Sequence, residues 1–521
     1  MKINKIFPIA GMLTMLLLGH TACDESKILE QTNPNAPAAS TFWQTADDAK
    51  KGIMGAYAPF TDIWYYTRFE VFVSDYRDDL VNGYGTSERT AAGQFAGVPE
   101  SNAAFWVWAA MFKGVSRAND VLANVPDIDM DQSAKDNILG EAYFIRAFNY
   151  FNLVNTWLNV PLIIVPAGEI LNTREVPQAD PAVVWEQIEK DLLEAQKLLP
   201  SDWSETDKGR VTNMGATAML GKAYLYQKKY DEAKAAFEKI LDPASGYGLE
   251  ADYRDNFREA SENNKESLFE IQLLADGNQG WCADCASHGT GAAFHQDLAP
   301  QSYTGQDGMR INQWALDLFL DETTINGEID PRAFTTLFWN TTETTTYQGD
   351  VLQSATYEGT SFQDAYGATD QRIFASKHLD FEQGYSAASI GWHFSGNNLR
   401  LIRYADILLM YAEAEFELNG STQVALDAIN EVRARVDMPA FTTLTMQDIR
   451  DERVKELSLE RSRYYDLLRW GLVKSRIADN SSIKSESGGT GAYQPGREYM
   501  AIPSIELDNS DVFTQNPGYN N

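Results

Sequence analysis

A helical hairpin of the tetratricopeptide type constrains the fold of this chain more than any other feature. Residues 219–241 read MLGKAYLYQKKYDEAKAAFEKIL. Small Gly221 and Ala233 stand where two antiparallel helices would approach each other, and the larger Leu220 and Phe237 would fill the seam between them. Because one such hairpin cannot bury its apolar face alone, the pattern predicts that further helix pairs stack against it.

Other segments carry related patterns. Residues 138–154, ILGEAYFIRAFNYFNLV, and residues 185–199, WEQIEKDLLEAQKLL, predict a second pair. Residues 407–436 predict a third pair, with Gly420 at the break between its helices. Residues 449–471, IRDERVKELSLERSRYYDLLRWG, predict one further helix rich in paired charges. Three or four helix pairs would form one curved, mainly α scaffold.

Helical periodicity is replaced by Gly, Thr, Asn and Ser between about residues 275 and 400, as in TTETTTYQGD and SGNNL. Such a long irregular segment in a compact protein is usually functional or disordered. Its aromatic residues favour an ordered, loop-rich second lobe laid on the helical one (Trp281, Phe294, Tyr303, Trp314, Trp339 and Trp392).

The N-terminus predicts export. Lys2 and Lys5 precede an apolar stretch of 14 residues, 6–19, and small residues follow it. This order is typical of a secretory signal peptide, which we place at residues 1–22. The apolar stretch is shorter than the roughly 20 residues that a spanning helix needs.

Cys23 follows two small residues, as in a bacterial lipobox, after which the cysteine becomes the first residue and carries lipid. His20 departs from that pattern, because an aliphatic residue usually stands three places before the cysteine. Asp24 and Glu25 resemble the acidic tag that directs Bacteroidota lipoproteins to the cell surface, although a plain solvated linker is the alternative. We predict lipidation at Cys23, followed by a tether.

The charge balance limits the class of ligand. Asp and Glu number 74 against 43 Lys and Arg, a formal net charge of −31. A field of that sign repels phosphate backbones, so we expect no nucleic acid partner. Neutral ligands meet no such penalty, and an aromatic content of 12% allows stacking on the C–H faces of sugars.

Cys282 and Cys285 predict a small disulfide loop, because the chain is expected in an oxidising space. A structural zinc site normally needs four ligands, and only His288 and His295 are near. We expect no metal and no cofactor.

We divide the chain into a signal peptide (1–22), a lipid-anchored tether (23–40), an N-terminal helical part (41–274), a loop-rich lobe (275–400) and C-terminal helical repeats with a tail (401–521), the last three in one integrated domain.

Several blocks, taken together and in order, resemble the SusD/RagB family of outer-membrane lipoproteins. Besides the lipobox they are EAYFIRAFNYFNLVNTWLNVPLI, NNKESLFEIQ, LRLIRYADILLMYAEAEFELNG, ERVKELSLERSRYYDLLRWG and the terminal AIPSIELDNS with TQNPGY. The resemblance implies a mainly α fold with about four tetratricopeptide-like pairs. It also implies a surface-exposed, non-catalytic protein that captures glycan for a SusC-like TonB-dependent transporter.

The resemblance also suggests ligand contacts. Arg68, Asn82 and Tyr84, in RFEVFVSDYRDDLVNGYG, stand near positions that supply a guanidinium, an amide and a stacking ring in the family. Trp281 and Tyr303 lie in segments matching its other aromatic contributors. Loop capping and surface filling are the alternative roles for Arg68, Asn82 and Tyr84, and core packing is the alternative for Trp281 and Tyr303.

Two other functions remain open from the sequence. Peptide capture, as in the RagB branch, would keep the fold and change the ligand. A lipid-anchored glycosidase would need two carboxyl groups flanking the scissile bond, and no motif marks such a pair.

Overall fold

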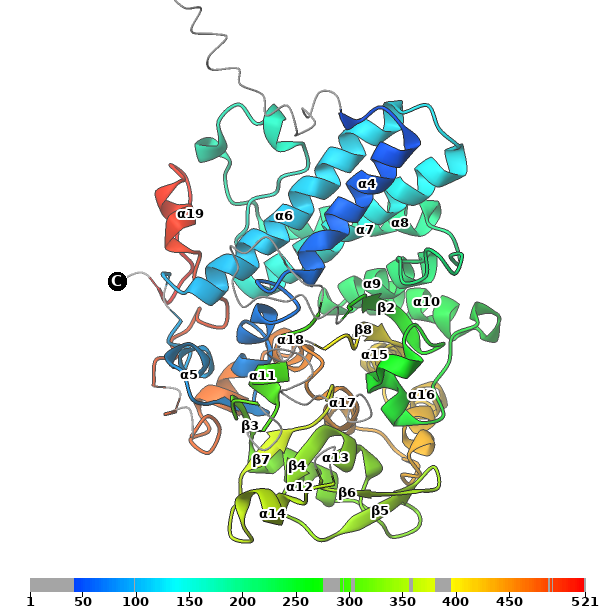
Figure 1. Cartoon of the computed structure of the whole chain (residues 1–521), viewed down its shortest axis with the longest axis vertical. Coiled ribbons are helices and arrows are strands. Elements are labelled where there is room, and N and C mark those ends of the chain that lie inside the picture. The colour runs from blue at the N-terminus through cyan, green and yellow to red at the C-terminus, as the bar shows by residue number, and fades with distance from the viewer. Residues whose placement is uncertain are drawn as a thin grey trace, which may run out of the picture.

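Helices dominate the structure (Figure 1). The computed structural model describes residues 42–519, with gaps at residues 98, 275–290, 294, 301–304, 356–358, 380–394, 486–487 and 490. The N-terminal group comprises α4 (Ala46–Tyr57), α5 (Ser87–Gly93), α6 (Asn102–Asn124), α7 (Gln132–Trp157), α8 (Pro181–Leu198), α9 (Asn213–Tyr226) and α10 (Tyr230–Leu241). The C-terminal group comprises α15 (Tyr404–Asn419), α16 (Gln423–Arg435), α17 (Met446–Leu457), α18 (Arg463–Arg469) and the short α19 (Ser504–Asp508).

The helices stack in chain order into one scaffold. α6 packs against α4 and α7, α7 against α8, α8 against α9, and α9 against α10. α10 then packs against α15, although more than 160 residues separate them, and α15 contacts α16 and α17. The predicted stack of helix pairs is therefore confirmed. Within the described part of the chain, no helix combines the length and apolar character needed to span a bilayer.

Small residues set the helix spacing, as the repeat pattern predicted. A Cβ atom added to Gly221 of α9 would lie 2.4 Å from a ring carbon of Phe237 in α10. One added to Gly140 of α7 would lie 2.9 Å from Cγ of Leu199, just after α8. Real Cβ atoms do not approach neighbours so closely, so a larger residue would force the two helices apart.

The single helix expected over residues 449–471 is wrong, because two helices, α17 and α18, take its place. The chain leaves the helical conformation between them, with φ of 66° at Leu459 and 62° at Arg461. Tertiary contacts explain the break: the intervening Glu460 accepts hydrogen bonds from Arg403 at 2.8 Å and from Lys377 at 2.6 Å. Buried ion pairs thus override the local helical pattern.

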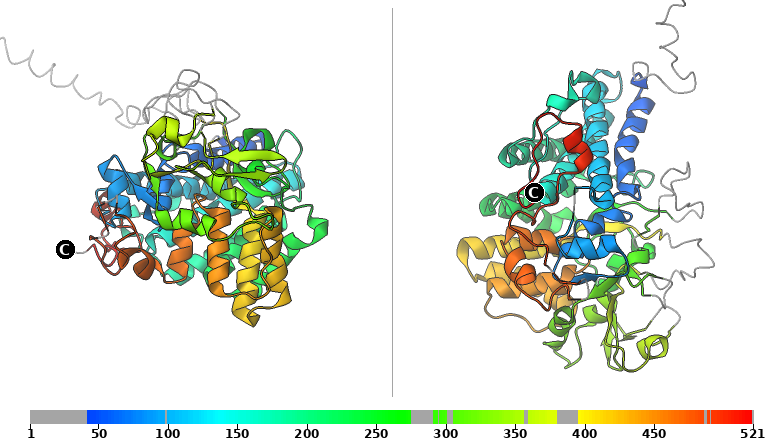
Figure 2. Two further views of the ribbon diagram at one scale, coloured as in Figure 1. Left: turned by 90° about the horizontal axis from the view of Figure 1, so that it is seen from below. Right: turned by 90° about the vertical axis from the view of Figure 1, so that its left-hand side faces the viewer.

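Short strands lie in the loop-rich region and at its borders, and one comes from the N-terminal part of the chain. A four-stranded antiparallel sheet has the order β1 (Val81–Gly83), β3 (Met309–Ile311), β7 (Ile373–Ala375) and β4 (Leu337–Trp339). β5 (Thr344–Tyr347) and β6 (Asp350–Gln353) form a hairpin, and β2 (Ser267–Ile271) pairs with β8 (Leu399–Arg403). Short helices α11 (His295–Leu298), α12 (Gln313–Leu320), α13 (Pro331–Thr336) and α14 (Phe362–Tyr366) complete the region. The left view of Figure 2 shows the yellow-green part of this region on the side opposite the gold and orange helices α16 and α17.

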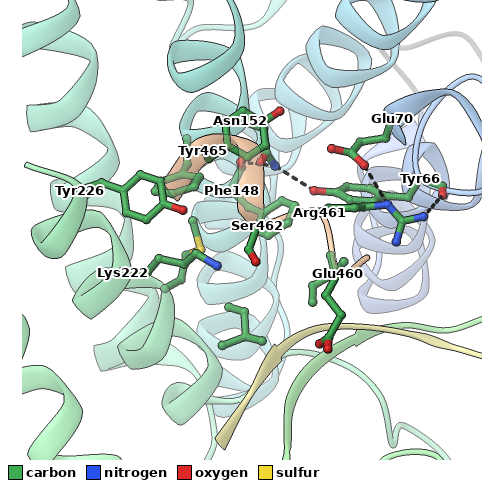
Figure 3. A pocket seen from close by; sticks show the side chains of 14 residues that line it. Tyr66, Glu70, Phe148, Asn152, Lys222, Tyr226, Glu460, Arg461, Ser462 and Tyr465 are labelled. Atoms are coloured by element: carbon green, nitrogen blue, oxygen red, sulfur yellow. Dashed lines mark hydrogen bonds and ion pairs between the residues drawn. The ribbon is translucent and has the colours of Figure 1, made fainter. Parts of the chain in front are cut away.

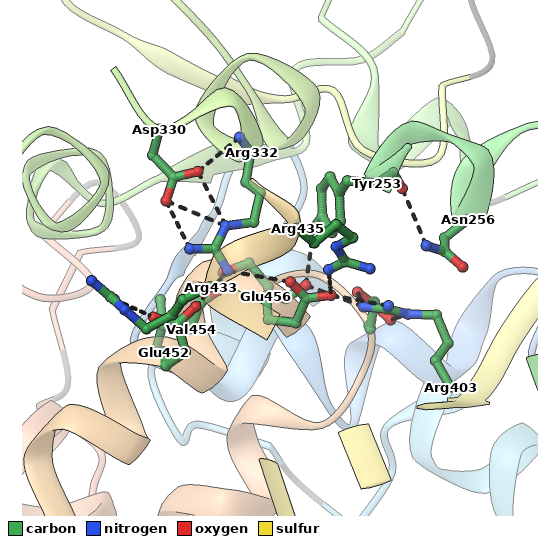
Figure 4. A network of polar contacts seen from close by, with 12 residues as sticks. Tyr253, Asn256, Asp330, Arg332, Arg403, Arg433, Arg435, Glu452, Val454 and Glu456 are labelled. Carbon is green, nitrogen blue, oxygen red and sulfur yellow. Dashed lines mark hydrogen bonds and ion pairs between the residues drawn. The ribbon is translucent and has the colours of Figure 1, made fainter. Parts of the chain in front are cut away.

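A buried ionic network joins this region to the C-terminal helices (Figure 4). The carboxylate of Glu456 accepts hydrogen bonds from Arg435 at 2.5 Å, Arg403 at 3.0 Å and Arg332 at 3.2 Å. Glu456 and Arg332 are fully buried. Burial alone would raise the pKa of Glu456, but the three guanidinium groups outweigh it and hold the pKa well below its ordinary value. The carboxylate therefore stays ionised in the core.

A second buried cluster holds the repeat helices together. Asp406 of α15 pairs with Lys222 of α9 at 3.2 Å and with Arg453 of α17 at 2.9 Å. Burial acts to raise the pKa of Asp406, but the two positive charges outweigh it and lower the pKa to about 2. This cluster links three helices that are distant in sequence.

Because the folded-state pKa of Asp406 lies below the unfolded value of about 4, its contribution is present above pH 4 and is lost as the pH falls toward 2. We expect Asp406→Asn to lower the free energy of unfolding by roughly 2 kcal/mol at pH 7. The difference in unfolding free energy between this variant and the wild type should shrink as the pH falls from about 4 toward 2. Urea unfolding across this pH range measures the difference, with exposed Asp427→Asn as control. A deficit independent of pH would contradict the assignment.

Candidate ligand-binding site

Tyr84 is exposed at the end of β1, beside an arginine of β3. The two strands pair with Asn82 opposite Arg310, and the Tyr84 N–H donates to the carbonyl of Gly308 at 2.9 Å. Because side chains alternate along a strand, Tyr84 and Arg310 lie on the same face of the sheet. The Arg310 guanidinium carbon lies 3.3 Å from the centre of the Tyr84 ring, and Tyr84 is 41% exposed. One ring face is thus covered by a cation while much of the side chain meets solvent.

A second arginine and tyrosine pair occupies the same face one strand further along. Arg310 stands opposite Phe374 of β7, and Arg372 lies two residues before Phe374. The Arg372 guanidinium carbon lies 4.8 Å from the centre of the Tyr366 ring, and its nitrogens reach Asp370 at 2.6 Å. The hydrogen bond from Arg372, together with its charge, lowers the pKa of Asp370, so this carboxylate is ionised.

Arg68 is largely buried and forms an ion pair. It is 9% exposed, and its Nε donates to Asp297 of α11 at 3.0 Å. Asp297 is fully buried and also binds Arg89 of α5. Arg89 in turn donates to the Tyr84 carbonyl at 3.4 Å. Arg68 therefore belongs to a buried cluster that positions the Tyr84 backbone. The sequence analysis expected its guanidinium at the ligand surface, whereas most of the side chain is shielded from solvent.

Asn82 lies within the sheet, 2% exposed, and its amide donates to the side-chain oxygen of Asn312. Asn312 itself donates to the Asp79 carbonyl at 2.8 Å. Gly83, the next residue, allows α5 to approach, because an added Cβ would lie 2.2 Å from the Arg89 carbonyl oxygen. Of the three residues predicted in this segment, Tyr84 is the exposed one.

The other predicted positions fall outside the described residues. Trp281 and Tyr303, the Cys282 and Cys285 pair, and the lipidation site Cys23 all lie in segments that the structure does not describe. They stay predictions.

Sequence reasoning missed Arg310, Arg372 and Tyr366. Arg310 lies in a three-residue strand, Arg372 directly precedes another, and Tyr366 ends a five-residue helix. These elements are too short for a clear periodic pattern. The available signal was an arginine between two apolar residues in MRI and an arginine before two apolar residues in RIF. That pattern is too common to single out a site before the strands are paired.

A small cavity lies between α7, α9 and the turn that precedes α18 (Figure 3). Its volume is about 40 Å³, enough for water but far below the roughly 300 Å³ of a small ligand pocket. Glu70 and Arg461 line it, 2.8 Å apart. Burial raises the pKa of Glu70 to about 8 despite the Arg461 charge. The cavity is too small to be the site of a sugar.

Comparison with known proteins covers nearly the whole chain. Residues 265–519 match the model described as SusD family, and residues 34–225 match one described as starch-binding associating with outer membrane. A SusD-like protein of Formosa agariphila is 24% identical over 100% of this chain and 99% of its own length. A SusD-like protein of Bacteroides ovatus is 27% identical over 79% of this chain and 78% of its own length.

Solved structures share the fold. A SusD superfamily protein from Bacteroides vulgatus has a TM-score of 0.79 at 24% identity, covering 92% of this chain and 100% of that one. A laminarin-binding SusD-like protein has a TM-score of 0.73 at 28% identity with the same coverage. Two family models match the two halves of the chain in order, and the fold agrees along most of its length, so this chain belongs to the SusD family.

Proposed function

We propose that the protein binds polysaccharide at the outer surface of the outer membrane and passes it, uncleaved, to a SusC-like TonB-dependent transporter. The observation that carries this proposal is the exposed Tyr84 ring stacked against Arg310. The starch-binding description of one matching family model and the laminarin binding named for one structural neighbour support it.

The chemistry of this surface suits a sugar. Sugar rings offer apolar C–H faces and many hydroxyl groups, which match an aromatic face flanked by fixed donors and acceptors. Arg372 is balanced by Asp370 and Asp307, so the surface presents hydrogen-bonding groups with paired charges. Such a surface favours a neutral ligand, as does the strongly negative chain.

The paired carboxylates also support a non-catalytic role. A glycosidase needs one carboxyl group protonated as the general acid and a second as base or nucleophile. Asp307 and Asp370 each pair with Arg372, and the buried Asp297 pairs with Arg68 and Arg89. Arg372 in addition holds the pKa of Asp370 below its usual range, which disfavours a proton on that oxygen.

Calorimetry with the chain from residue 24 onward tests the function, with laminarin and starch as ligands. We expect saturable binding of at least one polysaccharide and no release of reducing ends during prolonged incubation. Cleavage that persists in highly purified protein would contradict the non-catalytic role. Binding of peptides in place of polysaccharides would move the assignment to the RagB-like alternative.

Cys23→Ser is expected to abolish membrane association. Lipid on this cysteine is the one membrane contact that the sequence predicts, and several acyl chains anchor a protein far more firmly than one. Labelling cells with a radioactive or clickable fatty acid should mark the wild type and leave the Cys23→Ser variant unlabelled. Cys282→Ser, which removes a cysteine outside the lipobox, is the matched control and should keep the label. Label on the Cys23→Ser protein would refute the anchor.

A further inference from the structure

Two aromatic side chains stand out by exposure. Among the residues that the structure describes, Tyr84 and Trp106 are the most exposed aromatics, at 41% and 37%. Trp106 lies in the first two turns of α6, whereas Tyr84 directly follows β1. The proposed function uses Tyr84 and leaves Trp106 without a role.

Trp106 is part of a cluster of stacked rings. Its ring centre lies 4.7 Å from that of Trp64, with 25° between the planes, and Trp64 lies 4.9 Å from Phe69. Trp157 and Trp203 donate their indole N–H groups to backbone carbonyls at 3.1 and 2.8 Å. In the described structure neither Trp64 nor Trp106 makes such a bond, so two ring donors remain available at this surface.

Polar groups border these rings. Lys113 follows Trp106 by two helical turns, so both point to the same side of α6. Its ammonium lies 3.7 Å from Asp62, whose other carboxylate oxygen accepts the Trp64 backbone N–H at 3.1 Å. The surface thus combines an aromatic face, two indole donors and a balanced pair of charges, which is the chemistry that binds a neutral sugar.

A continuous set of contacts connects this cluster with Tyr84. The Arg68 guanidinium carbon lies 5.3 Å from the centre of the Phe69 ring, and Arg68 pairs with Asp297. Asp297 binds Arg89, which donates to the Tyr84 carbonyl. The two most exposed aromatic rings of the described structure are therefore held by one buried polar cluster, in a fixed relation to each other.

We propose that Trp106, supported by Trp64, forms a second sugar-stacking subsite that binds the same polysaccharide chain as Tyr84. This inference rests on the proposed function and adds to it a preference for ligands long enough to reach both rings. A trisaccharide would occupy the Tyr84 region alone.

Calorimetry on the Trp106→Ala variant tests the subsite. The probes are laminarin and its trisaccharide, or starch and maltotriose, whichever pair the wild type binds. Since one aromatic contact contributes on the order of 1 kcal/mol, we expect affinity for the polysaccharide to fall about fivefold. Affinity for the trisaccharide should not change. Trp106→Phe, which keeps a ring, should recover most of the loss.

Leu171→Ala is the matched control, because it removes an exposed apolar side chain that belongs neither to α6 nor to the ring cluster. Unchanged polysaccharide affinity in Trp106→Ala would overturn the subsite and leave the proposed function intact. Equal losses of affinity for the polysaccharide and the trisaccharide, together with a lowered melting temperature of the Trp106→Ala variant, would show that Trp106 has a structural role. That result would also overturn the subsite. A wild type that binds neither polysaccharide would overturn the proposed function and the subsite together.

Discussion

Glu456→Ala is expected to lower the free energy of unfolding by about 3 to 5 kcal/mol, the usual cost of removing one partner from a buried ion pair. The cost arises because Arg332, Arg403 and Arg435 would keep their charges in the core without the carboxylate that they share. Arg332 and Arg403 are almost fully buried, so water cannot easily replace the lost partner. Urea unfolding followed by circular dichroism measures the change.

Two control variants separate charge from packing. Glu417→Ala removes an exposed carboxylate from α15 and should change stability by less than about 0.5 kcal/mol. Glu456→Gln keeps the shape and some hydrogen bonds but loses the charge, so it should fall between wild type and alanine. If Glu456→Ala unfolds at the same urea concentration as Glu417→Ala, the network contributes no net stability.

Combined replacement of Trp281 and Tyr303 by alanine is expected to weaken polysaccharide binding about thirtyfold, if each ring contributes roughly 1 kcal/mol. Both residues are predicted ligand contacts from the family resemblance. Tyr84→Ala, whose exposed position the structure shows, should weaken binding about fivefold by the same reasoning.

Thermal unfolding distinguishes a ligand contact from a core residue. The double variant should keep the wild-type melting temperature while its affinity falls. A collapsed melting temperature would make Trp281 and Tyr303 core residues, and unchanged affinity would remove both from the site. Phe374→Ala removes a fully buried ring from β7, so it gives a reference for the fall in melting temperature that a loss of core packing causes.

The candidate site was only partly predictable. Tyr84 was identified from the sequence and is exposed, whereas Arg68 and Asn82, predicted with it, are buried in ion-pair and amide contacts. Arg310 was not identified, because its relation to Tyr84 exists only once β1 and β3 pair in register. Spacing along a chain does not report which side of a three-residue strand faces solvent.

Local sequence patterns were sufficient to predict the helical scaffold. Apolar residues at helical spacing, with Gly140 and Gly221 at the crossings, carry their information within a few turns of chain. Long-range contacts set the break at Glu460, the buried charges around Glu456 and Asp406, and the placement of Arg310 on Tyr84. These features depend on partners far apart in the chain, because a charge is stable in the core only where folding brings its counter-charge within hydrogen-bonding distance.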